Sequence, residues 1–469
     1  MSVVSPLAYG PAPGFAPPLF GHRHPERTPY ERLSEAIAAR SAVVGVVGLG
    51  YVGLPLAVAS AKAAFRTIGF DIDPTKPRMI AEARSYIGAV SSDDLDRLVD
   101  EQSLEATSDF SRLSACDVVI ICVPTPLTRH REPDLSFIEA TAKSVAAELR
   151  PGQLIVLEST TYPGTTREVL KPVLERTGFV AGEDFFLAFS PEREDPGNAA
   201  YGTTTIPKVV AGDGEKALKL VQAFYASVVD RVVPVSSTDV AEAVKLTENV
   251  FRAVNIALVN ELKLIFEAMD IDIWEVVEAA KTKPFGYMAF YPGPGLGGHC
   301  IPIDPFYLTW KSRESDTCTR FIELAGEINH AMPRHVIESL ARALDQRAHL
   351  ALSAARVLVI GLAYKKDISD IRESPSLKLI ELMEARGASV DYHDPHVPEI
   401  PLTREHPRLS GRGSAPIDPE HLAAYDVVLI ATDHDAVDYG LIRDHARLVV
   451  DTRNAMQRRG MSCDRVVKA

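Results

Sequence analysis

The chain has 469 residues, which is too long for a single hydrophobic core and predicts two or three domains. Its net charge of −13 argues against nucleic acids and anionic membranes as main partners, because an acidic surface repels both. The five cysteines lack the paired spacing of a disulfide framework, which favours a reducing compartment, and we expect a cytoplasmic protein.

The N-terminal segment is rich in Pro, Gly and Ala over positions 1–25 and shows little periodicity, so we expect a disordered tail over residues 1–40. This segment lacks the basic stretch followed by an apolar stretch that marks a signal peptide. Residues 41–61 are uncharged and long enough to span a membrane, but repeated glycines punctuate them. We therefore expect no membrane segment.

A nucleotide-binding pattern follows this tail. The apolar run Val43–Val47 predicts a strand, which leads into the turn Gly48-Leu-Gly-Tyr-Val-Gly53 and a helix-compatible segment over 54–64. A second strand over 65–70 ends at Asp71. This order of elements is the fingerprint of a dinucleotide-binding Rossmann unit. The glycines would admit the pyrophosphate, and Asp71 would bind the adenosine ribose, which favours NAD over NADP.

Lys76 and Arg78 lie close enough to Asp71 in the sequence to blur that preference. Two further apolar runs, over 117–123 and 154–157, predict parallel strands that are buried on both faces. Loops at the carboxyl ends of such strands form the ligand crevice. The loops expected beside the cofactor are 124–126, 159–161 and 190–193, within an NAD-binding domain over 41–235.

A long helix is predicted next, because no Gly or Pro interrupts residues 238–269. Lys245, Asn249 and Arg252 are spaced i, i+4 and i+7, so they share one face of this helix. They form either a functional face or the solvated side of an ordinary amphipathic helix, and the spacing alone does not distinguish the two.

Residues 291–305 read Tyr-Pro-Gly-Pro-Gly-Leu-Gly-Gly-His-Cys-Ile-Pro-Ile-Asp-Pro, a density of Gly and Pro that no helix or strand interior tolerates. They predict a shaped loop around Cys300. A lone cysteine is commonly a small buried hydrophobe, but glycines beside a thiol let a ligand reach the sulfur, which favours a nucleophile. Asp304 is placed to act as an acid or base or to hold a water.

The chain then repeats its first pattern. Residues 356–364 resemble 43–51, and residues 425–431 resemble 116–122. The second copy lacks the three glycines and carries a basic loop that starts with Lys365. Such a loop suits phosphate groups, although an exposed charged turn has the same composition.

The predicted fold class is therefore α/β, with two doubly wound Rossmann-like domains joined by a helical central domain with one long helix. The central domain, with the cysteine loop, is expected over 236–345, and the second Rossmann-like domain over 346–469.

Together these pieces resemble the UDP-sugar 6-dehydrogenase family, from about residue 41 to the end of the chain. The motifs that carry the resemblance are G-L-G-Y-V-G-L-P at 48–55, S-T at 159–160, S-P-E-R at 190–193, A-V-K-L-T-E-N at 243–249, G-L-G-G-H-C-I-P-I-D-P at 295–305 and Y-K-K-D-I-S-D-I-R-E-S-P at 364–375. The cysteine loop carries His299 and Ile303, as in the UDP-N-acetylglucosamine 6-dehydrogenase branch. The UDP-glucose branch has Ser and Lys at these two positions.

The resemblance implies a four-electron oxidation of the sugar C6 hydroxyl to a carboxylate, with two NAD in succession. Cys300 would attack the intermediate aldehyde to form a thiohemiacetal, whose oxidation leaves a thioester that water hydrolyses. Lys245 would stabilise the developing oxyanion or manage its proton, and Asn249 would hydrogen-bond the same oxygen. Asp304, with Thr160 and Glu192, would handle the water.

The resemblance also implies contacts with both nucleotides. The expected cofactor-binding residues are Gly48, Gly50, Tyr51, Val52, Gly53, Asp71, Lys76, Thr125 and Arg372. The expected substrate-binding residues are Arg193, Arg252, Gly297, Tyr364, Lys365 and Arg453. No metal is expected. The long helix is the expected contact of a homodimer or a higher homo-oligomer.

Other functions stay open at this point. UDP-glucose and UDP-N-acetylmannosamine are alternative substrates. A two-electron hydroxyacid or sugar-phosphate dehydrogenase shares the N-terminal fold but needs no cysteine nucleophile, so Cys300 opposes it. A non-catalytic nucleotide-sugar-binding protein would be expected to lose Cys300, Lys245 or Asp304, and all three are present.

Overall fold

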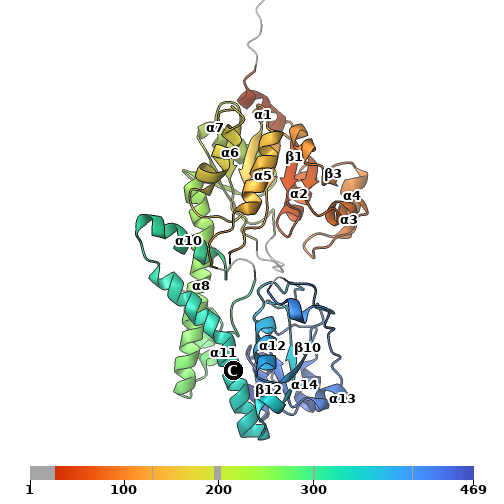
Figure 1. Ribbon diagram of the computed structural model, residues 1–469, viewed down its shortest axis with the longest axis vertical. Helices are drawn as coiled ribbons and strands as arrows, with labels where there is room; N and C mark the ends of the chain where they lie inside the picture. The colour runs from red at the N-terminus through yellow and green to blue at the C-terminus, as the bar shows by residue number, and fades with distance from the viewer. Residues whose placement is uncertain (1–26, 129, 195–201, 299–300, 404) are drawn as a thin grey trace, which may run out of the picture.

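The computed structural model describes residues 27–128, 130–194, 202–298, 301–403 and 405–469. An N-terminal sheet domain, a central group of helices and a C-terminal sheet domain are arranged along its longest axis (Figure 1). The predicted fold class is confirmed, with α8 (Thr238–Ala268) as the expected long helix. A second long helix, α11 (Arg320–Ala348), packs along α8.

The N-terminal sheet has the strand order β3-β2-β1-β4-β5-β6-β7-β8. Neighbouring strands are parallel, except that β6 and β7 are antiparallel. The strands are β1 (Val43–Val47), β2 (Arg66–Phe70), β3 (Leu104–Thr107), β4 (Val118–Ile121), β5 (Leu154–Leu157), β6 (Phe186–Phe189), β7 (Lys208–Gly212) and β8 (Val232–Pro234). The helices are α1 (Pro29–Ala38), α2 (Gly53–Lys62), α3 (Thr75–Ala81), α4 (Ser92–Asp100), η1 (Phe110–Ala115), α5 (Ser136–Ala147), η2 (Thr166–Leu170), α6 (Lys171–Glu175) and α7 (Glu215–Tyr225).

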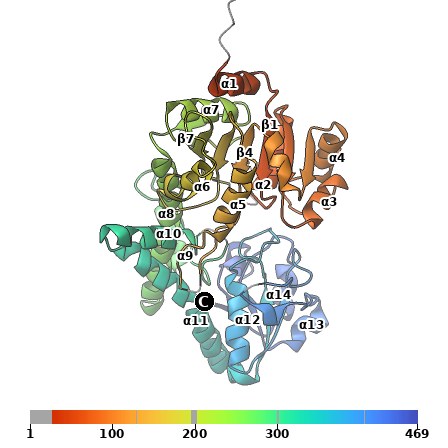
Figure 2. The ribbon, with the colours of Figure 1, turned by 45° about the horizontal axis from the view of Figure 1, so that its top comes forward.

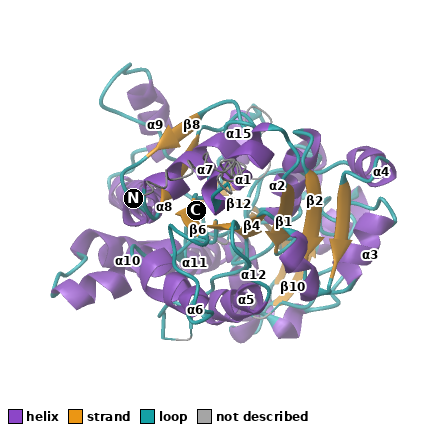
Figure 3. Ribbon diagram, turned by 90° about the horizontal axis from the view of Figure 1, so that it is seen from above, coloured by secondary structure: helices purple, strands orange, loops and turns teal. Residues whose placement is uncertain are grey.

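The central strands of this sheet are apolar on both faces because helices cover both faces. Helix α2 and helix α5 lie on opposite sides of the sheet (Figure 3). In β1, Val44 and Val46 pack in the core beneath α2, whereas Val47 packs in the core beneath α5. This arrangement explains the unbroken apolar runs, since successive residues of a strand point to opposite faces.

Helix α1 corrects the expected N-terminal tail. Residues 29–38 are helical, so the expectation of disorder as far as residue 40 is wrong for this stretch. Thr28 and Glu31 form a capping box, and Pro29 occupies the first helical position. Leu33 and Ile37, four residues apart, are buried in the N-terminal core. Residues 1–26 lie outside the described residues.

The central helices are α8, α9 (Ile273–Lys281), α10 (Asp304–Ser312), η3 (Arg313–Ser315) and α11. Helix α11 runs from beside α10 to the C-terminal domain, where it packs beside α12 (Figure 2). None of the helices in the described part of the chain is both long and apolar enough to cross a membrane.

The C-terminal sheet is parallel throughout, with the order β10-β9-β11-β12-β13. Its strands are β9 (Arg356–Ile360), β10 (Ser389–His393), β11 (Val427–Ile430), β12 (Val449–Asp451) and β13 (Val466–Lys468). Its helices are η4 (Leu352–Ala354), α12 (Pro375–Ala385), η5 (Pro407–Leu409), α13 (Pro419–Ala424), α14 (Tyr439–His445) and α15 (Ala455–Arg458). Leu340 and Leu344 of α11 belong to the core of this domain, so the proposed boundary at 345 falls inside a helix that both parts share.

Candidate active site

A cavity of about 210 Å³ lies where the three parts of the chain meet. The carboxyl ends of the N-terminal strands form one side, the polar face of α8 forms another, and loops around residues 297 and 364 close it. The lining residues expected from the sequence are Gly50, Tyr51, Val52, Thr125, Thr160, Glu192, Lys245, Asn249, Arg252, Gly297, Tyr364, Lys365 and Arg372. The structure therefore brings together residues that lie more than 300 positions apart in the sequence.

The glycines of the first turn have distinct physical roles. Gly48 has a φ of +92°, and a Cβ there would lie 2.5 Å from the Cys122 carbonyl oxygen. A Cβ on Gly53 would lie 1.8 Å from the Gly48 carbonyl oxygen, so no side chain fits. At Gly50, by contrast, no atom of the described residues comes within 4 Å of such a Cβ. This open backbone at the start of α2 fits the close approach of a pyrophosphate.

Asp71 follows β2, and its carboxylate is hydrogen-bonded to the backbone of the glycine turn. Its Oδ2 accepts hydrogen bonds from the Leu49 backbone N–H at 2.8 Å and from the Lys76 ammonium at 2.7 Å. Asp71 itself is 5% exposed. Lys76 thus forms an ion pair with the acidic residue that the sequence predicts to bind the adenosine ribose.

The cofactor turn also touches the C-terminal domain. The Arg372 guanidinium lies 4.6 Å from the centre of the Tyr51 ring, and Asp370 pairs with Arg372 at 2.6 Å. In the loop that follows β4, the Thr125 carbonyl oxygen accepts a hydrogen bond from the Tyr307 hydroxyl at 2.6 Å. Two loops that flank the cofactor position are therefore held by residues from the other two parts of the chain.

The polar face of α8 carries the groups expected to act on the substrate. Lys245 and Asn249 are each 5% exposed, and their side chains reach into the cavity with Arg252. The Lys245 ammonium lies 3.4 Å from the Glu192 carboxylate. The Asn249 amide donates a hydrogen bond to Asp304 Oδ2 at 2.5 Å. Lys245 and Asn249 therefore face inward, whereas Arg252, which also lines the cavity, is exposed.

Asp304 begins helix α10 and is 2% exposed. Burial raises the pKa of its carboxyl to about 7, although the Lys245 charge and the hydrogen bond from Asn249 both lower it. A carboxyl with this pKa is able to accept or release a proton near neutral pH.

His299 and Cys300 lie outside the described residues, but their neighbours Gly297, Gly298 and Ile301 line the cavity. A Cβ on Gly297 would lie 2.4 Å from Tyr364 Cβ, and Gly298 has a φ of +86° against the Tyr364 ring. The sequence suggests that the glycines admit a ligand. The structure shows that these two glycines make room for a tyrosine of the C-terminal domain.

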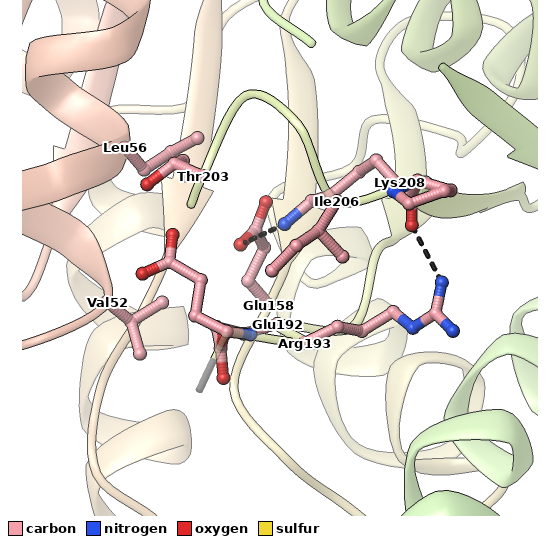
Figure 4. Close-up of a pocket in the computed structure, with 10 residues that line it drawn as sticks. Val52, Leu56, Glu158, Glu192, Arg193, Thr203, Ile206 and Lys208 are labelled. Atoms are coloured by element: carbon pink, nitrogen blue, oxygen red, sulfur yellow. Dashed lines mark hydrogen bonds and ion pairs between the residues drawn. The ribbon is translucent and has the colours of Figure 1, made fainter. Parts of the chain in front are cut away.

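A second, smaller pocket of about 20 Å³ adjoins the cavity and shares Val52, Glu158, Glu192 and Glu194 with it (Figure 4). Arg193 lines this smaller pocket and, among the described residues, does not line the larger one. Its guanidinium pairs with Glu248 of α8 at 2.5 Å and donates to the Pro207 carbonyl at 2.7 Å. Arg193 therefore joins the 190–193 loop to α8, where the sequence predicted a substrate contact.

Glu158 and Lys208 were missed by the sequence reasoning. Glu158 ends the buried run of β5, is 2% exposed and lines both pockets. The Lys208 ammonium pairs with it at 2.9 Å, and the Tyr225 hydroxyl donates to its other oxygen (Figure 4 shows the pair). The signal in the sequence was a charged residue directly after an apolar strand, because a carboxylate buried at the end of a strand needs a partner of opposite charge.

Arg453 lies beneath the loop that leads to the cysteine. Its Nε donates to the Ala431 carbonyl at 2.8 Å, and a Cβ on Gly293 would lie 2.5 Å from its Nη1. Burial lowers the pKa of this guanidinium. Arg453 is absent from the described residues that line the cavity, in contrast to Tyr364 and Lys365.

Comparison with known proteins agrees with this division. Three domain models of one family match in order: the NAD binding domain over residues 42–229, the central domain over 239–331 and the UDP binding domain over 358–458. The chain belongs to the UDP-glucose/GDP-mannose dehydrogenase family. It is therefore an NAD-dependent oxidoreductase of the nucleotide sugar dehydrogenase type.

Individual relatives cover most of the chain. It is 37% identical to a UDP-N-acetyl-D-glucosamine 6-dehydrogenase of Pseudomonas aeruginosa, over 83% of this chain and 90% of that protein. It is 33% identical to the enzyme of the same name from Salmonella typhi, over 83% and 89%. The solved structure of a UDP-D-ManNAc dehydrogenase from Pyrococcus horikoshii aligns with a TM-score of 0.80 at 33% identity, covering 91% of this chain and 97% of that one.

Proposed function

We propose that the protein oxidises the C6 hydroxyl of UDP-N-acetylglucosamine to a carboxylate, with two NAD and one water consumed for each sugar. The observation that carries this proposal is that Lys245 and Asn249 line the cavity together with residues on both sides of the cysteine loop, while Asp304 accepts a hydrogen bond from Asn249. A cation, an amide and a titratable carboxyl, together with the thiol that this loop carries in the sequence, are the groups that a covalent aldehyde oxidation needs.

Each group has a defined task in this scheme. NAD, when bound, accepts a hydride from the substrate carbon in each of the two oxidations. Lys245 stabilises the negative charge that develops on the C6 oxygen, and Asn249 donates to the same oxygen. The Cys300 thiolate adds to the aldehyde, and after the second oxidation it leaves as water attacks the thioester. Asp304 accepts a proton from that water, with Thr160 and Glu192 beside it.

The substrate assignment depends on the form of the cysteine loop. Ile303 lies in an apolar cluster with Tyr162, Leu246 and Tyr307, so position 303 adds no cation to the cavity, unlike the lysine of the UDP-glucose branch. The relatives named above that are called UDP-N-acetyl-D-glucosamine 6-dehydrogenases support the same choice. A site that hydrogen-bonds an acetamido group leaves those groups unpaired when glucose is bound.

UDP-N-acetylmannosamine is the second candidate, because the aligned solved structure bears that name. Turnover with a panel of the three UDP-sugars, with NADH counted per sugar, decides between them. We expect two NADH per UDP-N-acetylglucosamine and the highest kcat/KM for that sugar. A higher kcat/KM for another sugar contradicts the substrate assignment, and one NADH per sugar contradicts the four-electron reaction.

The cysteine has its own test. Cys300→Ser should bind both ligands but lose steady-state acid formation, because a hydroxyl is a weaker nucleophile and a poorer leaving group than a thiolate. Cys318→Ser, at an exposed cysteine, is the matched control and should behave as wild type. Wild-type turnover by Cys300→Ala would contradict covalent catalysis.

We also propose that α8 forms the contact of a homodimer. Phe251, Leu258 and Ile265 are spaced by seven residues and are 47%, 51% and 42% exposed, which places an apolar stripe on the outer face of this helix. A second copy of the same helix covers such a stripe in a two-fold contact. Leu258→Asp should convert the dimer to monomer in sedimentation measurements, and an unchanged mass would contradict this contact.

A further inference from the structure

Glu242 is a fully buried carboxylate that the reaction scheme above does not use. It lies on α8 and is 0% exposed. Its Oε2 accepts a hydrogen bond from the Gly164 backbone N–H at 2.6 Å. Its Oε1 accepts from the Thr166 backbone N–H at 2.8 Å and from the Thr166 hydroxyl at 2.6 Å. Both carboxylate oxygens therefore hold the segment that follows β5.

That segment carries Thr160 to the cavity. At its start, the Ser159 hydroxyl donates to the Val123 carbonyl at 2.8 Å. At its end, Gly164 has a φ of +102° and is held by Glu242. Thr160 lies between these two anchors and lines the cavity. Removing the second anchor takes away the hydrogen bonds that hold Gly164 and Thr166 to α8.

Glu242 also belongs to the functional face of α8. Residues 242, 245 and 249 are spaced i, i+3 and i+7, so the carboxylate extends the stripe that carries Lys245 and Asn249. The Glu242 side chain thus joins the loop with Thr160 to the helix with Lys245, one turn away from the ammonium group.

We propose that Glu242 is a positioning residue, which sets the Thr160 loop at the correct distance from Lys245 and Asn249 for the chemical steps. This inference rests on the proposed function, since it assigns a role within that reaction. The donors at Gly164 and Thr166 all point at the carboxylate, so a side chain that itself donates cannot replace it. Displacement of a reacting group by about 1 Å costs on the order of 100-fold in rate.

The chain offers a matched control in the same pair of elements. Asp239 lies one turn before Glu242 on α8 and pairs with Arg167 at 3.1 Å, one residue beyond Thr166. Both of these side chains are largely exposed, so their ion pair contributes little to stability. A second control is Asp117, which accepts from the Val43 backbone N–H at 2.8 Å at the opposite end of the sheet.

The experiment compares Glu242→Gln with Asp239→Asn and Asp117→Asn in the full-length enzyme. Steady-state kinetics, thermal unfolding and hydrogen exchange of the peptide that covers residues 159–170 are measured for each. For Glu242→Gln we expect kcat to fall by about tenfold or more, while KM for both ligands changes by less than about threefold. Exchange in the 159–170 peptide should accelerate. Asp239→Asn should leave all readouts unchanged, and Asp117→Asn should lower stability without lowering kcat.

A kcat within about twofold of wild type in Glu242→Gln overturns the proposal, whether or not exchange accelerates. An equal loss of kcat in Asp117→Asn also overturns it, because the effect is then one of general stability. If Glu242→Gln does not fold, Thr166→Val takes its place, because it removes only the hydroxyl that donates to Glu242. This variant should also lower kcat, by a smaller factor. An unchanged kcat in Thr166→Val counts against the proposal. Failure of the proposed function is separate, since it shows in the wild-type assay as the wrong product or NADH count.

Discussion

The two sheet domains begin with the same strand and turn, and each places an aspartate where its second strand ends. In the N-terminal domain, Asp71 accepts a hydrogen bond from the Leu49 backbone N–H at 2.8 Å. In the C-terminal domain, Asp394 accepts one from the Leu362 backbone N–H at 2.6 Å. The two aspartates therefore have the same structural role in supporting the first turn.

They differ in what else they bind. Asp71 also accepts a hydrogen bond from the Asp73 backbone N–H at 3.0 Å and pairs with Lys76, whose side chain is partly exposed. Asp394 instead accepts hydrogen bonds from the Ala363 backbone N–H at 3.0 Å and from His434 Nε2 at 3.0 Å. His434 is fully buried, and its Nδ1 accepts from a backbone N–H, which fixes Nε2 as the donor.

The turns differ in the same sense. Gly50, with open space beside it, corresponds to the buried Ala363, and Gly53 corresponds to Lys366. One copy of the fold thus leaves its turn open beside Gly50 and pairs its carboxylate with a partly exposed lysine, which suits a dinucleotide. The other uses them within its own structure and presents Tyr364 and Lys365 to the cavity. The lesson is that similar strands bind different nucleotides according to what the first turn leaves free.

The largest effect is expected for Gly53→Ala. The added Cβ would meet the Gly48 backbone at 1.8 Å, which no side-chain rotation relieves. We expect a loss of about 3 kcal/mol in stability and loss of NAD binding, measured by chemical unfolding and calorimetry. Lys366→Ala, at the corresponding position, should stay within about 0.5 kcal/mol of wild type. Equal effects in both variants would contradict the comparison.

Asp394→Asn should destabilise the C-terminal domain by about 2–3 kcal/mol, because an amide replaces a charged acceptor of several backbone N–H groups. The KM for NAD should not change. A rise in the NAD KM without loss of stability would show that this aspartate binds the cofactor after all.

Asp71→Ala should raise the KM for NAD by the equivalent of about 1.5–3 kcal/mol through loss of the ribose contacts. Stability should fall less than in Asp394→Asn, since fewer backbone groups depend on this carboxylate. Steady-state kinetics with varied NAD provides the measurement. An unchanged NAD KM would mean that the adenosine pocket lies elsewhere.

Lys365→Ala should raise the KM for the UDP-sugar by about tenfold, as expected for the loss of one charged hydrogen bond, and should leave NAD binding intact. Kinetics with each ligand varied in turn separates the two. Loss of NAD affinity alone would reverse the assignment of the domains to their nucleotides.

The smallest effect concerns Asp304, which lies between the two domains. Its pKa is about 7 in the folded protein and 3.8 in an unperturbed carboxyl, so its ionisation destabilises the fold progressively as pH rises through this interval. Asp304→Asn should therefore gain stability relative to wild type as pH increases from 5 to 8, on the order of 2 °C in Tm. A difference that does not vary with pH would show that the carboxyl has an ordinary pKa.

Local patterns made much of this architecture predictable from the sequence. The glycine turn, the second strand and Asp71 at its end follow from steric rules that act within thirty residues. The spacing of Lys245, Asn249 and Arg252 follows from helical geometry. The sequence indicated that Gly297 and Gly298 are needed in the cysteine loop, but it suggested a ligand as the reason, whereas these glycines make room for Tyr364. The capped helix at 29–38 was missed because composition outweighed its capping box.

Only the tertiary structure decided which partners these residues meet. Arg193 pairs with Glu248, 55 positions away, and Glu158 pairs with Lys208, 50 positions away. Gly297 makes room for Tyr364 of another domain, and Asp394 is bound by His434. A side chain's charge and size are written in the sequence, whereas the group that satisfies its charge or fills its space is set by packing between distant elements.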